Sequence, residues 1–264
     1  MNERENLYRK EREREFHNRE FGDSARSGAD KFYAVTRLSF RHYLSLVRDG
    51  CAGKRILEYG CGPDGAAFDL ARLGAKVTGI DISDVAIARA QETADRQGLT
   101  TADFRRMDAE RMEFPDGSFD LIIGTGILHH LNLGDALPEI SRTLRQHGRA
   151  VFLEPLGHNP LIRFYRWLTP QMRSADEHPL LIGDFRQMHK HFGRVDLYPY
   201  HLSSLAAVPF RGTRAFERVL GALEAIDGAV FRMLPIARRY AWMTLVVLSD
   251  PLAGRPTQGA RPYG

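Results

Sequence analysis

The chain has 264 residues, of which 43% are hydrophobic and 27% charged, which suits one α/β domain with an elaboration. Its net charge is only +4 and the basic excess is spread out, so we expect no nucleic acid partner, which would require a concentrated basic face. Two cysteines, a densely charged N-terminus and short apolar runs predict a cytoplasmic protein with no disulfide framework, no signal peptide and no stable membrane insertion.

The chain opens with a strongly charged segment. Acids and bases alternate over residues 1–21, which predicts a solvated helix or a frayed arm that begins to pack only near Phe16, His17 and Phe21. Apolar residues then recur with a period near 3.6 over residues 31–47, which predicts a helix. We therefore expect residues 1–50 to form an N-terminal helical arm or cap.

A glycine-rich turn organises the middle of the chain. Residues 55–65 read as a short strand, a tight turn from Gly60 to Gly65 and the start of a helix, and the next strand ends at Asp81. Doubly wound sheets hold an adenosine ribose with such a turn and an acid at that position. The turn carries Glu58 and Asp64 but no lysine or arginine, so it suits a ligand with a cationic centre better than a pyrophosphate.

Strands and helices alternate through the rest of the chain, which argues for a mainly parallel, doubly wound sheet. After the fifth strand the pattern gives way to irregular loops, and an apolar helical insertion over residues 202–235 precedes the last strand. The seven predicted strands are 54–59, 75–80, 104–107, 119–123, 149–154, 194–200 and 241–249.

Four motifs in order resemble those of the class I S-adenosylmethionine-dependent methyltransferases. They are Leu57-Glu-Tyr-Gly-Cys-Gly-Pro-Asp-Gly65, Val77-Thr-Gly-Ile-Asp-Ile-Ser83, Met107-Asp-Ala-Glu110 and Phe119-Asp-Leu-Ile-Ile-Gly-Thr-Gly-Ile-Leu-His-His-Leu131. The resemblance covers about residues 54–155. It implies a Rossmann-like, seven-stranded α/β sheet with an antiparallel last strand, with S-adenosyl-L-methionine as cofactor and S-adenosyl-L-homocysteine as product.

The resemblance also divides the chain into parts. Residues 51–155 would bind the cofactor, residues 156–250 would supply substrate-side loops, a helical lid and the last strands, and residues 251–264 would form a flexible tail. Asp81 would accept both ribose hydroxyls, Ile82 would pack on the adenine, and Asp108 would meet the adenine amino group. The cofactor-binding residues that it implies are Glu58, Tyr59, Gly60, Gly62, Asp81, Ile82, Asp108, Ala109, Glu110, Gly124 and Thr125.

Methyl transfer is a displacement at a sulfonium, so the enzyme needs alignment of the reactants and, for most acceptors, a base. The candidates for the catalytic base are His129, Glu154 and His158, which follow the fourth and fifth strands. Alternatives remain open for two of them: His129 could be a helix-start histidine bonded to backbone, and Glu154 could pair with a nearby arginine or act as a cap.

The loops over residues 154–180, with their aromatics, histidines and arginines, and the apolar segment 202–235 together predict a pocket for a mid-sized, partly apolar small molecule with a polar or anionic handle. The sequence leaves open a prenyl, phenolic or carboxylate acceptor, O- or C-methylation, and the oligomeric state, a homodimer included. Candidate substrate-binding residues are Tyr33, Tyr43, His130, Asn159, Arg163, Arg173 and His178.

We expect no required metal, because neighbouring histidines such as His129 and His130, or His189 and His191, are poorly spaced to chelate one ion. Magnesium for a diphosphate substrate is the one alternative left open. Two other functions are kept as alternatives. One is a protein or RNA methyltransferase, although Gly124-Thr-Gly-Ile127 replaces the Asn-Pro-Pro-Tyr type of motif that amino-group methylation often uses. The other is a non-catalytic protein that binds S-adenosylmethionine.

Overall fold

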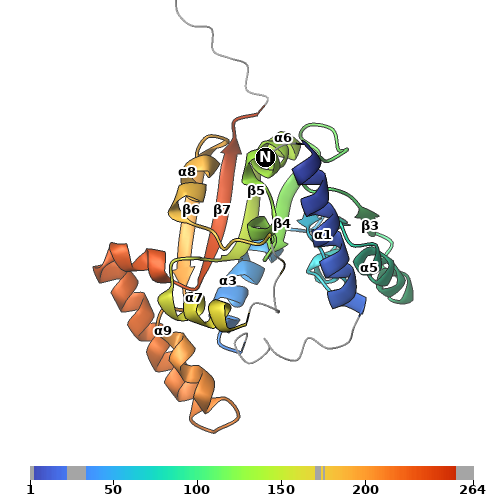
Figure 1. The fold of residues 1–264 in the computed structure, drawn as a ribbon. Helices are drawn as coiled ribbons and strands as arrows, with labels where there is room; N and C mark the ends of the chain where they lie inside the picture. Colours follow the sequence, from blue (N-terminus) through green and yellow to red (C-terminus); the bar gives the residue numbers. More distant parts are fainter. Residues whose placement is uncertain (1–2, 23–33, 170–173, 175, 254–264) are drawn as a thin grey trace, which may run out of the picture.

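The computed structural model describes residues 3–22, 34–169, 174 and 176–253. These residues form one seven-stranded sheet with the order β3-β2-β1-β4-β5-β7-β6, which confirms the predicted architecture (Figure 1). The strands are β1 (Arg55–Tyr59), β2 (Lys76–Asp81), β3 (Ala102–Arg106), β4 (Phe119–Thr125), β5 (Leu144–Pro155), β6 (Phe192–Tyr200) and β7 (Met243–Pro251).

The first five strands pair in parallel, and β7 inserts antiparallel between β5 and β6. Strand β1 pairs with β2 on one side and β4 on the other, so the strand order reverses at β1. In open α/β sheets, ligands bind beyond the carboxyl ends of the strands at this reversal.

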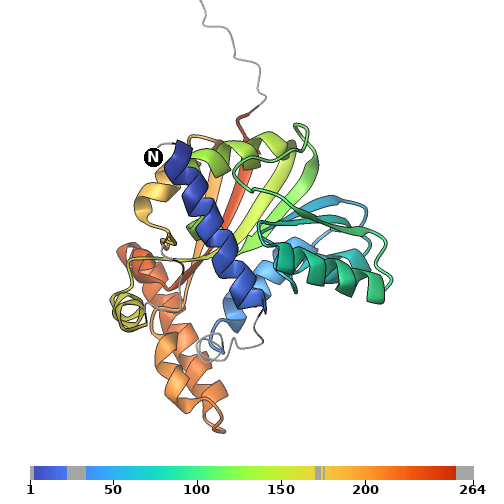
Figure 2. The same ribbon diagram turned by 45° about the vertical axis from the view of Figure 1, so that its right-hand side comes forward.

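Helices cover both faces of the sheet (Figures 1 and 2). They are α1 (Glu3–Gly22), α3 (Arg37–Arg48), α4 (Ala67–Arg72), α5 (Asp84–Arg96), α6 (Leu133–Thr143), α7 (Pro160–Leu168), α8 (Ile182–Met188) and α9 (Phe216–Met233), with short 3₁₀ turns η1 (Leu128–His130), η3 (Ser204–Phe210) and η4 (Pro235–Tyr240). Elements α7 and α9 lie beyond the carboxyl ends of the parallel strands (Figure 1).

Alternate strand residues build two apolar layers, because successive side chains of a strand point to opposite faces. Ile56 belongs to the layer under α3, α4 and α5, whereas its neighbour Leu57 belongs to the layer under α6 and α8. Because β1 and β4 are buried on both faces of the sheet, their sequences are nearly continuous apolar runs.

Helix α1 differs from its prediction as a solvated helix or frayed arm. It crosses the front of the molecule (blue in Figures 1 and 2), and Arg9 and Glu13 of its charged face are buried. Their partners lie in the loops after β3 and β4, so no periodicity within the helix could reveal this packing. Among the described residues, no helix is long and apolar enough to cross a bilayer.

Candidate active site

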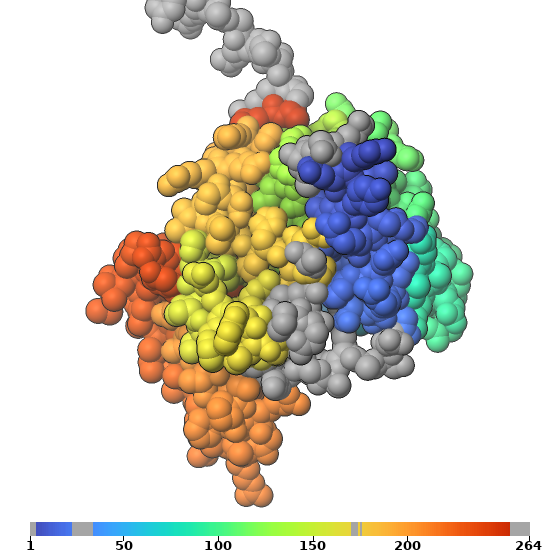
Figure 3. Space-filling model, viewed as in Figure 1, coloured from blue at the N-terminus to red at the C-terminus, as the bar shows by residue number. Residues whose placement is uncertain are grey.

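A cavity of about 810 Å³ lies at the carboxyl ends of β1, β2 and β4. Its floor is the glycine turn, its far wall is the loop after β4 and the start of α7, and its near wall is α1, which lies over this face (Figure 3). Small-molecule pockets generally fall between about 300 and 1,000 Å³. The cavity therefore has the size of a site for a small organic ligand.

The glycine turn is held from beneath by Glu58. Its two carboxylate oxygens accept the N–H groups of Ala66 (2.6 Å) and Ala67 (2.8 Å), where α4 begins. A Cβ on Gly65 would lie 2.5 Å from these oxygens, so only glycine fits there. Burial, with the negative charges of Asp64 and Asp81, raises the pKa of Glu58 to about 7, against the lowering effect of the two N–H groups.

Asp81 is oriented by backbone on the floor of the cavity. Oδ2 accepts the N–H of Gly62 at 3.0 Å, and Oδ1 accepts the N–H of Ser83 at 2.8 Å. Each carboxylate oxygen has a further acceptor site, and Asp81 lines the cavity. The geometry fits a ligand that presents two neighbouring hydroxyl groups.

Two acids after β3 meet two bases of α1. Lys10 Nζ lies 2.6 Å from Asp108 Oδ2 and 3.1 Å from Glu110 Oε2, and Arg9 pairs with Glu110. Arg9 also donates to the carbonyl oxygen of His130 at 3.0 Å. Helix α1 is thereby fastened to the acid, Asp108, that the family resemblance assigns to adenine.

The loop after β4 carries a histidine held by a buried carboxylate. Glu154 Oε1 accepts the N–H groups of Ile127 (2.9 Å) and Leu128 (2.8 Å), and Glu154 Oε2 lies 2.9 Å from His129 Nδ1. With Glu154 ionised, the hydrogen bond assigns the proton to Nδ1 and leaves the lone pair on Nε2. His129 also lines the cavity, so it is the candidate proton acceptor there.

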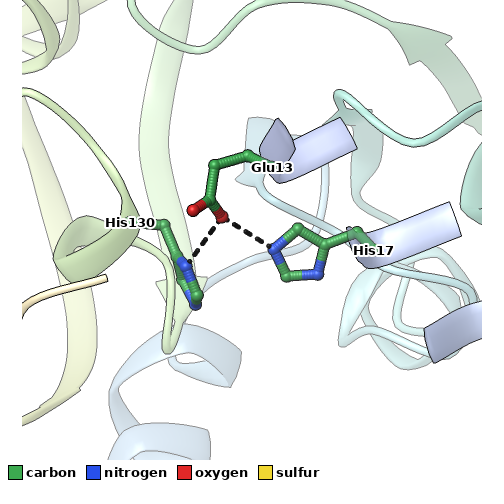
Figure 4. A group of neighbouring side chains, drawn as sticks. All are labelled: Glu13, His17 and His130. Carbon is green, nitrogen blue, oxygen red and sulfur yellow. Dashed lines mark hydrogen bonds and ion pairs between the residues drawn. The ribbon is translucent and has the colours of Figure 1, made fainter. Parts of the chain in front are cut away.

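A second histidine meets two residues of α1 on the rim of the cavity (Figure 4). Glu13 Oε2 lies 3.1 Å from His130 Nδ1 and 3.5 Å from His17 Nε2. Burial would raise the pKa of Glu13, but hydrogen bonds from His130, His17 and Ser174 outweigh it and lower that pKa. Burial also lowers the pKa of His130.

Most of the predicted cofactor-binding residues line the cavity, and their assignment to the cofactor remains a prediction. Three do not line it: Glu58 caps α4, Gly124 packs against Ile127 and Phe152, and the Tyr59 hydroxyl donates to the carbonyl oxygen of Ala109. The residues in the lining are Gly60, Gly62, Asp81, Ile82, Asp108, Ala109, Glu110 and Thr125.

The three candidates for the catalytic base also divide into residues inside and outside the cavity lining. His129 lines the cavity, but Glu154 is fully buried behind it with both oxygens engaged. His158 accepts the N–H of Ile182 at 3.3 Å, outside the lining. Of these three candidates the cavity lining contains only His129, and the role of each remains a prediction.

Of the five substrate-binding candidates that the structure describes, only His130 lines the cavity. Asn159 caps α7 and donates to the carbonyl oxygen of Tyr240 (2.8 Å), and Tyr43 is fully buried in the core. Arg163 and His178 are exposed outside the lining. Tyr33 and Arg173 lie outside the described residues.

Several lining residues were missed by the sequence analysis. Those on α1 were missed because their segment reads as solvated, although the apolar and histidine positions Phe16, His17 and Phe21 gave a signal. Tyr165 of α7 was missed, although it lies within one turn of Arg163. The missed residues include Arg9, Lys10, Glu13, Phe40, Tyr165 and Trp242.

Comparison with known proteins places residues 57–152 in a family model described as a methyltransferase domain. The chain is 37% identical over 110 residues to a ubiquinone biosynthesis O-methyltransferase of Nitrosococcus oceani, covering 41% of this chain and 46% of that protein. It is 31% identical over 126 residues to an uncharacterized methyltransferase of Schizosaccharomyces pombe, covering 47% of this chain and 86% of that protein. The chain thus spans about half the length of the ubiquinone biosynthesis enzymes that it matches.

Among solved structures, the fold is shared with a geranyl diphosphate C-methyltransferase of Streptomyces coelicolor. The TM-score is 0.58 with 15% identity, and the match covers 87% of this chain and 88% of the other. That structure was solved in complex with Mg²⁺, geranyl diphosphate and S-adenosyl-L-homocysteine. At this level of identity the likeness shows a common fold.

Proposed function

Because this chain belongs to the class I S-adenosylmethionine-dependent methyltransferases, we propose that it methylates a partly apolar small molecule. The observation that carries the proposal is the cavity of about 810 Å³, which is lined both by the oriented carboxylate of Asp81 and by the Glu154-held His129.

The residues present fit the cofactor. Asp81 has acceptor sites for two hydroxyl groups, and the acids Asp64 and Asp81 in the lining favour a ligand with a cationic centre. S-adenosylmethionine, when bound, supplies an electrophilic methyl group on a sulfonium. Gly60, Gly62, Asp81, Ile82 and the segment 108–110 would hold it.

The chain's own residues would then align and deprotonate the acceptor. His129 would take the acceptor's proton at Nε2, while Glu154 would hold Nδ1–H and stabilise the imidazolium that results. Phe40, Tyr165 and Trp242 would provide apolar walls, and Arg166 of α7 a polar one. A base at His129 favours a phenol or another acidic hydroxyl over an acceptor without a removable proton.

The proposal is tested by calorimetry of S-adenosylmethionine and S-adenosylhomocysteine with the wild-type protein and Asp81→Asn. Asparagine keeps one acceptor oxygen but loses the charge and the second one, so the cofactor should lose one hydrogen bond to a charged group. At about 1.5–3 kcal/mol for such a bond, cofactor binding should weaken on the order of 10- to 100-fold.

The matched control is Asp103→Asn, an exposed carboxylate on β3 outside the cavity, which should bind the cofactor like the wild type. Unchanged affinity of Asp81→Asn would overturn the ribose assignment. Failure of the wild type to bind either ligand would overturn the proposed function itself.

A further inference from the structure

We propose that Glu13, His17 and His130 form a binding site for a divalent transition metal ion of the zinc type, which would fasten α1 to the loop after β4. Figure 4 shows the three side chains converging, two from α1 and one from η1. The proposal concerns metal binding alone and does not depend on the methyl transfer proposed above.

The spacing of the three ligand atoms suits one small ion. Glu13 and His17 are four residues apart, so they share one face of α1. Glu13 Oε2 lies 3.1 Å from His130 Nδ1 and 3.5 Å from His17 Nε2, and all three atoms lie within 4.8 Å of one another. Ligands bound at about 2.0–2.2 Å in a tetrahedral zinc site are roughly 3.4 Å apart. Two of the three separations already match that value.

The surrounding groups are those that usually support a metal ligand set. Ser174 donates its hydroxyl to the second oxygen of Glu13, and Glu177 Oε2 lies 3.9 Å from Nε2 of His130, the ring nitrogen that faces away from Glu13. Metal-bound histidines commonly direct their other ring nitrogen to a carboxylate, and ligating carboxylates are themselves hydrogen-bonded. Such partners fix the ring orientation and increase the affinity of the site.

The aromatic rings around His17 also support a metal site. The ring of Phe16 meets it edge-on at 5.3 Å, and the ring of Phe21 stacks on it at 5.7 Å. These rings limit the access of water to the cluster from the α1 side.

The chemistry of the donors selects the class of ion. Two imidazole nitrogens and one carboxylate oxygen suit zinc, cobalt or iron, whereas magnesium prefers an all-oxygen shell. All three residues line the cavity, so a fourth coordination position would open toward the bound ligands. Three protein ligands with one open position are typical of a reactive rather than a purely structural zinc site.

The test is a titration of the chelator-treated, full-length protein with cobalt(II) chloride, followed by visible absorption. We expect one equivalent to give the intense bands of a four- or five-coordinate cobalt site, and zinc to displace them. Glu13→Gln and His17→Gln should each weaken binding by about 100-fold or more, and Ser174→Ala by about 10-fold. Glu11→Gln, an exposed carboxylate on the same helix, is the matched control and should bind like the wild type.

A second measurement follows α1 itself. Metal should slow hydrogen exchange of the amides of residues 9–17 in the wild type and leave it unchanged in Glu13→Gln. Absence of cobalt bands in the wild type, or equal titrations for the wild type, Glu13→Gln and His17→Gln, would show that the cluster is a hydrogen-bonded network only. Calorimetry of S-adenosylmethionine on the same samples separates that outcome from failure of the proposed function.

Discussion

His129 and His158 have the same predicted role in the sequence but different positions in the structure. His129 lines the cavity and is held by Glu154, whereas His158 accepts a backbone N–H outside it. We expect His129→Asn to lower kcat by about 10²–10⁴-fold, the usual contribution of a general base, with cofactor affinity unchanged.

The control for this prediction is His158→Asn, which should retain the wild-type kcat. Both variants are assayed for methyl transfer to a phenolic acceptor, with binding of S-adenosylmethionine measured in parallel. Equal rates for the wild type and His129→Asn would remove His129 as the base and leave the reaction dependent on alignment alone.

Two other buried groups, Glu58 and His201, should give the protein opposite pH dependences. Burial lowers the pKa of His201 from 6.5 to about 4, against a raising effect of Asp227, while the pKa of Glu58 is raised from 4.5 to about 7. The Ser39 hydroxyl donates to the carbonyl oxygen of Thr36, so it accepts from His201 Nε2, and His201 Nδ1 is left to accept from Ser204. A proton on Nδ1 would break that arrangement.

The signs follow from which state binds the proton. Between pH 4 and 6.5 the unfolded chain protonates His201 and the folded chain does not, so this group makes the free energy of unfolding rise with pH. Between pH 4.5 and 7 the folded chain keeps a proton on Glu58 that the unfolded chain has lost, so stability falls with pH. Each effect is on the order of 3 kcal/mol over its full range.

Urea unfolding from pH 4 to 7.5 checks this prediction. Relative to the wild type, His201→Asn should lose stability as the pH rises and Glu58→Gln should gain it. Asparagine suits position 201 because His201 has a φ of 63°, a left-handed conformation that asparagine tolerates. Parallel curves for the three proteins would contradict the assignment of either protonation state.

Among the helices and strands, α1 is the element whose packing was least predictable from the sequence. Its charges look solvated because each buried partner is about a hundred residues away: Arg9 pairs with Glu110, and Glu13 with His130. The core strands were predictable since their apolar runs, turns and motifs are local. A side-chain pair between distant segments leaves no periodic trace, and so the near wall of the cavity and the Glu13–His17–His130 cluster were not foreseen.

Arg9 should therefore matter more than its charged neighbours. We expect Arg9→Met to destabilise the protein by about 3 kcal/mol, the lower end for a broken buried pair, since Lys10 remains near Glu110. Hydrogen exchange along α1 should accelerate in the same variant. Arg12→Met removes an exposed pair with Asp176 and should change neither the stability nor the exchange rates appreciably.

Thermal and urea unfolding, with hydrogen exchange resolved along α1, distinguish the two arginine variants. If Arg9→Met and Arg12→Met behave alike, α1 is not fastened through Glu110. The comparison also separates docking of the helix from any effect of metal, because Arg9 is not among the proposed ligands.

Over the whole molecule, the last strand of the chain, β7, is an interior strand of the sheet, between β5 and the edge strand β6. The family resemblance predicted an antiparallel last strand, and the structure confirms it between β5 and β6. The roles of individual site residues were less accessible, because a strand pattern does not reveal whether a side chain such as Glu58 or Glu154 faces a ligand or the backbone behind it.

Because β7 is an interior strand and β6 an edge strand, truncating a leucine to alanine should cost more stability on β7 than on β6. Leu245 on β7 is fully buried, and Leu197 on the neighbouring edge strand β6 is 39% exposed. Leu245→Ala should lower the free energy of unfolding by about 2–5 kcal/mol, because it leaves a cavity in the core. Leu197→Ala should cost less than about 1.5 kcal/mol, since little of its surface is removed from water. Similar urea midpoints for both variants would argue against the strand order.

The position of β7 also has a consequence for how the protein is made. While the ribosome adds residues 156–242, β5 has emerged with one edge unpaired, and β6 later emerges without the neighbour that it needs. At ~5–20 residues per second this stage lasts several seconds. Open strand edges invite pairing with other chains, so the nascent protein should depend on chaperones most just before Met243–Pro251 appears, and least once that strand closes the gap.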